Sequence, residues 1–203
     1  MIEQLEQVAA RPVSRETFEK LEAYVAQLKE GNARQNLISV STLHHIWARH
    51  ILDSAQLVRF EPRPGASWVD IGSGAGLPGI VIACLVEGSV ALVEPRRLRS
   101  DFLHKVVESL QLNVSVVRSR VERLAGHYDV ITARAVSNLA DILKISQHLS
   151  TRNTVWTLPK GRNAQSELAE AQRAWQGTFH LERSATDEDS WIIVGTGVRA
   201  KGR

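Results

Sequence analysis

The sequence has one cysteine, no long hydrophobic run and only a small excess of positive charge. The single thiol, Cys84, excludes an internal disulfide and any metal site made of several thiolates, which agrees with a reducing compartment. The longest apolar run, from about Gly79 to Val86, is far too short to cross a bilayer. The chain does not open on a basic region followed by an apolar run, so we expect no signal peptide and a cytoplasmic protein.

Lysine and arginine number 25 against 22 acidic residues, which gives a net charge of +3. This weakly basic balance hints at a polyanionic partner, although many enzymes that bind no nucleic acid share it. A composition with 43% hydrophobic and 23% charged residues is typical of globular proteins and argues against disorder. A length of 203 residues favours one structural unit, and we expect a monomer.

Two expected helices precede the first expected strand. Ser14 is a suitable N-cap for a helix whose apolar residues recur at helical spacing and which Gly31-Asn32 ends. A second helix is expected over residues 43–60, after Ser41-Thr42. We interpret residues 1–61 as a helical extension packed on a core of residues 62–203, the two forming one compact structural unit.

From residue 62 onward, short β-rich runs alternate with helical periods, which predicts an α/β fold with a parallel sheet. The expected strands cover residues 67–72, 89–94, 114–119, 128–135 and 154–158. The expected helices cover residues 77–86, 98–112, 138–149 and 164–176. Residues 178–183 and 190–197 have only an acidic loop between them, so we expect an antiparallel pair at one edge, followed by a loose basic tail over 198–203.

The stretch "WVDIGSGAGLPGI" predicts a strand, a tight glycine turn and a helix start, and it fits two ligand-binding fingerprints. Residues 70–76 match D-x-G-x-G-x-G, which is typical of methyl-donor sites. Gly74, Gly76 and Gly79 also match the G-x-G-x-x-G of dinucleotide sites. Both sites expect an acid at the end of the next strand to bind ribose hydroxyls, and Glu94 stands there.

Three features favour the methyl donor. The carboxylate of Asp70 would repel a pyrophosphate but suits the ammonium group of S-adenosylmethionine. Pro78 removes one of the amides that a pyrophosphate would use. After Glu94 too little chain remains for a second nucleotide half and a substrate domain. The donor site is then expected to include Asp70, Gly72, Gly74, Gly76 and Glu94. The plain alternative is a structural strand-to-helix turn.

Several methyl-transfer chemistries lack the residues they need. Methylation of an adenine amine commonly uses an Asn/Asp-Pro-Pro-aromatic loop, whereas the corresponding loop here is Ala133-Arg134-Ala135-Val136. Methylation of a pyrimidine carbon needs a cysteine nucleophile at the sheet edge, and Cys84 falls within an expected helix. The seven histidines show no metal-binding spacing, so we expect no metal.

Two further segments follow strands at the edge where open α/β sheets bind ligands. Val121-Glu122 lies where such a fold closes over an adenine, although a solvated surface turn fits the pattern as well. Arg134 follows the fourth expected strand, where it could orient the donor, hold an RNA phosphate or form a structural salt bridge.

Six segments occur in the order "NARQNLISV", "ARHILDSAQL", "VDIGSGAGLPGI", "SRVERL", "TARAVSNL" and "LPKG". In this order they resemble the glucose-inhibited division protein B family, also called ribosomal RNA small-subunit methyltransferase G. The resemblance runs from about Asn32 to Gly161. It implies a class I, Rossmann-like methyltransferase with a seven-stranded, mostly parallel sheet, helices on both faces and an N-terminal helical layer.

The resemblance also implies an activity: transfer of a methyl group from S-adenosylmethionine to N7 of a guanine in a loop of 16S ribosomal RNA. Because N7 carries an exposed lone pair, this reaction needs no general base, so no catalytic residue is certain and Arg134 and His50 are the candidates. The partner would be 16S ribosomal RNA or the small ribosomal subunit. A small-molecule methyltransferase and a non-catalytic RNA-binding protein that retains a donor site remain alternatives.

Carried over residue by residue, the family's donor site covers Gly72, Leu77, Val121, Glu122 and Arg134. Arg49, His50 and Lys160 match family positions that face the RNA, although His50 and Asp53 could simply fix the helical layer to the sheet. Pro159 precedes Lys160 where many relatives have leucine directly before the lysine. The densest basic cluster, also expected to guide RNA or else to be a solvated helix face, is Arg96, Arg97, Arg99 and Lys105.

Overall fold

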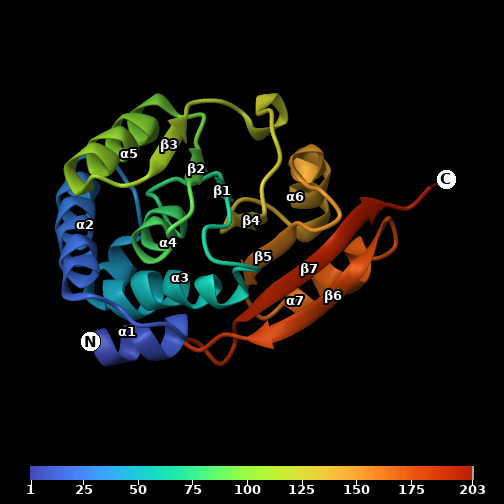
Figure 1. Ribbon diagram of the computed structural model, residues 1–203, viewed down its shortest axis with the longest axis horizontal. Helices are drawn as coiled ribbons and strands as arrows, with labels where there is room; N and C mark the ends of the chain where they lie inside the picture. Colours follow the sequence, from blue (N-terminus) through green and yellow to red (C-terminus); the bar gives the residue numbers. More distant parts are fainter. Residues whose placement is uncertain (203) are drawn as a thin grey trace.

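A seven-stranded sheet with the order β3-β2-β1-β4-β5-β7-β6 forms the centre of the computed structural model, which describes residues 1–202 (Figure 1). Strands β1 to β5 run parallel, and β7 is antiparallel to both β5 and β6. The strands are β1 (Trp68–Ile71), β2 (Val90–Val93), β3 (Val114–Val117), β4 (Val130–Ala133), β5 (Val155–Lys160), β6 (Trp175–Arg183) and β7 (Trp191–Ala200). The expected α/β fold and its antiparallel edge pair are confirmed.

Helices cover both faces of this sheet (Figure 1). One buried cluster joins the sheet to the first helices and to those after β1 and β2, and it includes Leu5, Leu21, Ile80 and Leu103. A second cluster on the opposite face includes residues of the last two helices. The helices are α1 (Ile2–Ala9), α2 (Arg15–Arg34), α3 (Asp53–Ala55), α4 (Gly79–Leu85), α5 (Arg97–Leu110), α6 (Leu139–Ser146) and α7 (Ala164–Ala171).

Local capping explains where α2 begins and how the chain leaves it. The hydroxyl of Ser14 accepts a hydrogen bond from the amide of Thr17 at 3.0 Å, as expected of this N-cap. The helix ends at Arg34, three residues or so beyond the expected stop. Beyond it, the side-chain oxygen of Asn32 accepts the amides of Leu37 and Ile38, both at 2.9 Å, and so turns the chain toward the sheet.

The expected single helix over residues 43–60 was wrong. This segment is a series of short turns of different pitch: the 3₁₀ turn η1 (Val40–His45), the π turn η2 (Trp47–Leu52), α3 and the 3₁₀ turn η3 (Gln56–Phe60). The hydroxyl of Ser54 donates to the carbonyl of His50 and competes with the regular helical ladder. A π turn inserts an extra residue, and here it carries Arg49 and His50 beside the sheet edge.

The C-terminal expectations also need correction. Trp175 and Gln176 begin β6 and do not extend the preceding helix, because their backbones pair with Ala200 and Arg199 of β7. The same pairing keeps β7 in the sheet up to Ala200, so residues 198–200 of the expected loose tail belong to the strand. Lys201 and Gly202 follow the strand, and Arg203 lies outside the described residues. Sequence reasoning also missed α1. Within residues 1–202, no helix combines the length and apolarity needed to cross a membrane.

Candidate functional site

Most backbone amides of the turn between β1 and α4, residues 72–78, donate to carbonyls of the turn itself or of β2. The amides of Gly72 and Ser73 both donate to the carbonyl of Val93, and those of Gly76 and Leu77 both donate to the carbonyl of Ser73. A pyrophosphate binds such a turn through free amides at the helix start. Since these amides already have acceptors, the turn is built for a ligand that is not held by its phosphates.

Asp70, at the third position of β1, occupies the start of α4. Its Oδ2 atom accepts the amide of Gly79 at 3.0 Å. A side chain at Gly79 would collide with Leu92 and with the Asp70 carboxylate, so only glycine allows this close approach. The protein therefore places its own carboxylate where a dinucleotide site would receive a phosphate.

The other carboxylate oxygen of Asp70, Oδ1, is buried and has no hydrogen-bond partner among the described residues. Burial raises the pKa of Asp70 to about 7, although the Gly79 hydrogen bond and the positive charge of Arg134 oppose this effect. A carboxyl group in this state gains from a cation placed nearby. The residues present therefore fit a donor that carries an ammonium group.

Glu94 follows β2 and fixes the middle of the glycine turn. Its Oε2 atom accepts the amide of Gly74 at 3.0 Å, and its Oε1 atom accepts the amide of Arg96 at 2.8 Å. Gly74 has a φ of +57°, a left-handed conformation that favours glycine. Arg99 extends its guanidinium to the same place, because a Cβ added to Gly74 would lie 3.5 Å from it.

The helical layer reaches this turn through a buried tyrosine. The hydroxyl of Tyr24, on α2, donates to the carbonyl of Ala75 at 2.9 Å, and the Tyr24 side chain is fully buried. Leu77, two residues further along, packs into the same core cluster. On the other side, Val136 from the loop after β4 lies against Gly72, where a Cβ would come within 2.7 Å of it.

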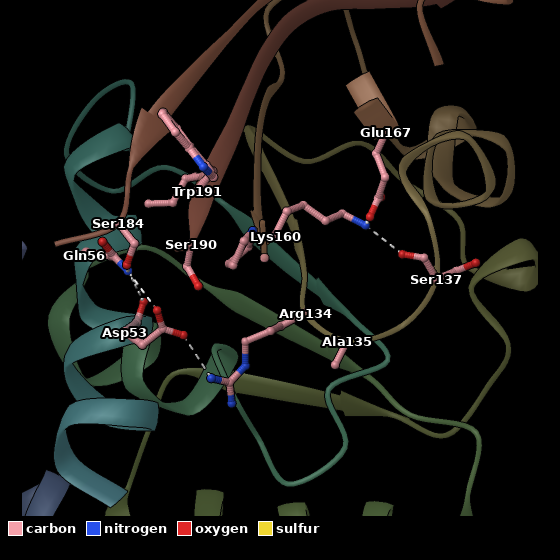
Figure 2. Close-up of a pocket in the computed structure, with 13 residues that line it drawn as sticks. Asp53, Gln56, Arg134, Ala135, Ser137, Lys160, Glu167, Ser184, Ser190 and Trp191 are labelled. Atoms are coloured by element: carbon pink, nitrogen blue, oxygen red, sulfur yellow. Dashed lines mark hydrogen bonds and ion pairs between the residues drawn. The ribbon is translucent and has the colours of Figure 1, made fainter. Parts of the chain in front are cut away.

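Arg134, directly after β4, connects the sheet edge to the helical layer. Its Nη1 atom lies 3.1 Å from Oδ2 of Asp53 (Figure 2). Its Nη2 atom lies 3.3 Å from Nδ1 of His50. The same guanidinium donates to the carbonyl of Arg49 at 3.4 Å. This structural ion pair was one of the alternatives that the sequence left open for Arg134.

His50 is held in its neutral form by these neighbours. Burial lowers its pKa to about 4, and the positive charges of Arg134 and Arg49 act in the same direction. A guanidinium can only donate, so Nδ1 of His50 accepts from Arg134 and Nε2 carries the hydrogen toward the hydroxyl of Thr42 at 2.8 Å. Such a histidine is a weak base at neutral pH.

A cavity of about 350 Å³ opens beside Arg134, outside the carboxyl ends of β4 and β5 (Figure 2). Inside it, the ammonium of Lys160 lies 2.8 Å from Oε2 of Glu167 on α7 and donates to the carbonyl of Ser137 at 2.7 Å. The first residues of β7 form the opposite wall. The lining residues are Asp53, Gln56, Arg134, Ala135, Ser137, Pro159, Lys160, Gly161, Glu167, Ser184, Ser190, Trp191 and Ile192.

The acidic loop between β6 and β7 borders the mouth of this cavity. Asp187 binds the guanidinium of Arg49 at 2.7 Å, and Asp189 approaches that of Arg162 at 3.4 Å. All four side chains keep partial solvent exposure. The loop therefore neutralises two arginines at the rim while leaving them accessible to a competing anion.

The sites expected from the sequence fall into two groups along one edge of the sheet. Lys160 lines the cavity, whereas Arg49 and His50 line a neighbouring pocket that shares Asp53, Arg134 and Ser190 with it. Arg96 and Arg97, exposed after β2, lie on the far side of the glycine turn because β1 and β4 separate β2 from β5. The 3₁₀ turn η4 (Val121–Arg123) follows β3, with Val121 buried and Glu122 exposed.

The lining residues that sequence reasoning missed include Gln56, Glu167 and Trp191. Glu167 occupies an amphipathic helix where an acid ordinarily faces solvent, so no local pattern marks it. Trp191 opens an otherwise aliphatic strand, and its large ring was the one available signal. No group of three or more His, Cys, Asp or Glu side chains within residues 1–202 has the geometry of a metal site.

Comparison with known proteins gives a consistent result. Residues 17–188 match the family model described as rRNA small subunit methyltransferase G. The ribosomal RNA small subunit methyltransferase G of Sphingopyxis alaskensis is 49% identical over 91% of this chain and 80% of its own length. The protein of the same name from Zymomonas mobilis is 44% identical over 93% of this chain and 90% of its own length.

Solved structures show the same fold at low sequence identity. A putative S-adenosyl-L-methionine-dependent methyltransferase from Methanococcus maripaludis has a TM-score of 0.58 and 12% identity, covering 87% of this chain and 94% of that protein. A ribosomal protein L11 methylase from Lactobacillus delbrueckii has a TM-score of 0.56 and 13% identity, covering 76% and 79% of the two chains. The expected class I methyltransferase architecture is confirmed.

Proposed function

Because the chain belongs to the rRNA small subunit methyltransferase G family, we propose that it transfers a methyl group from S-adenosylmethionine to N7 of a guanine in a loop of 16S ribosomal RNA. The family match over residues 17–188 is the observation that carries this proposal. The geometry of the glycine turn supports it independently, since the amides of Gly72, Ser73, Gly74, Gly76 and Leu77 already have acceptors and are not offered to a pyrophosphate.

S-adenosylmethionine brings a methyl group on a positively charged sulfur and, at its amino-acid end, an ammonium group. We propose that the negative charge of Asp70 beneath the turn attracts this end, and that Gly72, Gly74 and Gly76 let the backbone come close to it. Arg134 lies within reach to orient the same end once it exchanges part of its contact with Asp53.

We place the ribose and adenine of the donor beside the ends of β2 and β3. Glu94 keeps acceptor capacity on both oxygens after binding two amides, which suits the hydroxyls of a ribose. Leu77 is buried in the turn, and Val121 is buried in η4. Glu122, next to Val121, is exposed. We assign these three residues to the adenine side of the site.

Methylation at N7 requires no general base from the protein. Guanine N7 presents its lone pair at neutral pH, so the chain needs only to hold the base in line with the methyl group. The state of His50 agrees with this, because its low pKa and its bonds to Arg134 and Thr42 make it a positioning residue and not a base.

The RNA must present an unpaired or splayed base, because N7 faces the deep, narrow major groove of A-form RNA. We propose that Arg96 and Arg97 on one side of the donor site, and Arg49, His50 and Lys160 on the other, bind the surrounding RNA. A ribosomal substrate implies action in the cytoplasm, and the monomer expected from the sequence is retained as part of the proposal.

The proposal is tested by incubating the protein with labelled S-adenosylmethionine and small ribosomal subunits from cells that lack the activity. We expect 7-methylguanosine when the digested 16S RNA is analysed by mass spectrometry. A methylated nucleoside of another kind would refute the choice of N7. Donor binding without any transfer would favour the non-catalytic alternative, and transfer to small molecules alone would favour the second enzyme class.

A further inference from the structure

The ion pair between Lys160 and Glu167 is unusual in its position. The Lys160 side chain is only 9% exposed and that of Glu167 is 26% exposed, yet both line the cavity beside Arg134. Solvated pairs on helix surfaces contribute little to stability, and a pair withdrawn into a cavity loses hydration as well. A role in folding alone does not account for both charges facing the cavity (Figure 2).

Each partner keeps hydrogen-bonding capacity that nothing in residues 1–202 uses. The Lys160 ammonium has three N–H donors and uses two, on Ser137 and on Oε2 of Glu167. Oε2 of Glu167 also accepts the amide of Leu139, whereas Oε1 receives no hydrogen bond from any of residues 1–202. A free donor and a free acceptor therefore stand side by side in the cavity.

Both oxygens of the other carboxylate in the cavity, that of Asp53, already have partners. Oδ1 of Asp53 accepts from Gln56 and Thr186, and its Oδ2 binds Arg134. The amide of Gln56 is also used, since its oxygen accepts the amide of Ala185. Within the described part of the chain, Glu167 is thus the carboxylate of this cavity that has an oxygen without any hydrogen-bond partner.

We propose that Lys160 and Glu167 read the Watson–Crick edge of the acceptor guanine, with Lys160 donating to O6 and Glu167 accepting from N1–H and the N2 amino group. This inference rests on the proposed function and names the residues that select its base. Flipped bases are commonly recognised along this edge between apolar walls. The apolar walls here are Pro159, Trp191 and Ile192.

The order of charges selects guanine over adenine. Guanine presents an acceptor, O6, next to the N1–H donor, which complements an ammonium next to a carboxylate. Adenine presents a donor next to an acceptor and would oppose both groups. The cavity volume of about 350 Å³ lies at the small end of the range of ~300–1,000 Å³ for small-molecule sites, which suits one nucleotide.

The same placement directs N7 toward the donor. On a purine, N7 lies on the side of O6 that faces away from N1. We place the base with O6 and N1 on the ion pair and with N7 facing Arg134 and Ala135, which line the same cavity at the end of β4. Val136, the residue after Ala135, lies against Gly72 of the glycine turn.

The test compares 16S RNA that carries either guanosine or inosine at the single acceptor position, because inosine lacks only the N2 amino group. For the wild-type protein we expect kcat/KM to be about tenfold lower with inosine, the loss typical of one hydrogen bond to a charged acceptor. For Glu167→Gln we expect this ratio to fall to near one, because the single oxygen of glutamine stays on the Leu139 amide and Lys160 while its amino group, a donor, faces the base. The glutamine still accepts the Leu139 amide, so folding is retained.

Glu170→Gln is the matched control, because Glu170 lies exposed on the same helix, outside the cavity, and should keep the wild-type ratio. Equal rates of the wild-type protein on the two RNAs, or a ratio unmoved by Glu167→Gln, would overturn the inference. Binding of guanosine and inosine monophosphates with S-adenosylhomocysteine present gives the same comparison without turnover. If the protein proved not to methylate N7, this binding preference would still decide the inference separately from the proposed function.

Discussion

At Asp70, burial favours the neutral carboxyl group, whereas the Gly79 hydrogen bond and the positive charge of Arg134 favour the carboxylate. The raised pKa of about 7 means that the carboxyl group exchanges its proton near physiological pH. A group with a raised pKa stabilises the fold below its unfolded pKa of 3.8, and this contribution is lost as pH rises through about 7. The ionised form that a cationic ligand needs is thus the less stable form of the free protein.

We expect S-adenosylmethionine to bind more tightly as pH rises from about 6 to 8, because only ionised Asp70 attracts its ammonium group. Asp70→Asn should remove this pH dependence, weaken binding at pH 8 by roughly tenfold, and raise the free energy of unfolding there by about 1–2 kcal/mol. Calorimetric titration in buffers of different ionisation enthalpy measures the released proton. Glu108→Gln, an exposed change on α5, serves as control. A pH-independent wild-type affinity would contradict the role of Asp70.

Residue roles differ in how far the sequence could reveal them. Asp70 and Glu94 stand at fixed distances from glycines in one motif, so their places beside the turn followed from local spacing. Glu167 reaches Lys160 from a separate helix, and only the packing of α7 against the sheet brings them together. The partners of Arg134 depend in the same way on tertiary contacts with residues more than 80 positions earlier.

At the scale of elements, α2 is tied to the glycine turn by one hydrogen bond. Tyr24→Phe removes the donor and leaves the carbonyl of Ala75 buried without a partner. We expect the free energy of unfolding to fall by about 1–3 kcal/mol and donor affinity to fall severalfold, because the turn loses a fixed contact. Chemical denaturation and donor titration measure the two effects.

The chain offers a matched control in its other tyrosine. Tyr128 is half-buried, and its hydroxyl makes no hydrogen bond to any of residues 1–202. Tyr128→Phe should therefore change neither stability nor donor binding appreciably. If the two variants behaved alike, the Tyr24 hydrogen bond would have no special part in holding the turn.

Elements with strong periodicity were predictable, and those shaped by their neighbours were not. The sheet strands and α2 follow from alternation and from the Ser14 cap. The turns of residues 40–60 change pitch because side chains such as Ser54 bond to the backbone, and because Trp47 stacks on Phe18 with ring centroids 5.4 Å apart. The first residues of β6 are extended because they pair with β7. Hydrophobic periodicity alone does not predict such pairing.

For the whole molecule, we propose that residues 1–61 and 62–203 form one cooperative unit, as expected from the sequence. Leu5, Leu21 and Leu28 are fully buried in the same cluster as Ile80 of α4. Removing the helical layer would expose this face of the sheet and leave Ala75 without Tyr24.

We expect the fragment 62–203 to lose cooperative unfolding and its near-ultraviolet circular dichroism, because the apolar surface that it exposes favours loosely packed states. Thermal and chemical unfolding of the fragment and of the full chain provide the comparison. A fragment with a sharp unfolding transition and measurable donor affinity would show that the core is an independent domain.

The tyrosine bond from α2 to the glycine turn has a consequence for the order of events in the reaction. The helical layer touches the donor turn through Tyr24, and through Arg49 and His50 it holds Arg134, which lines the acceptor cavity. RNA that shifts this layer therefore also shifts the carbonyl of Ala75. Thermodynamic linkage then requires that whatever factor bound RNA exerts on donor affinity, the bound donor exerts equally on RNA affinity. The product of methyl transfer, which has lost the sulfonium charge, would change both affinities together and so couple the release of the modified RNA to the exchange of the spent donor.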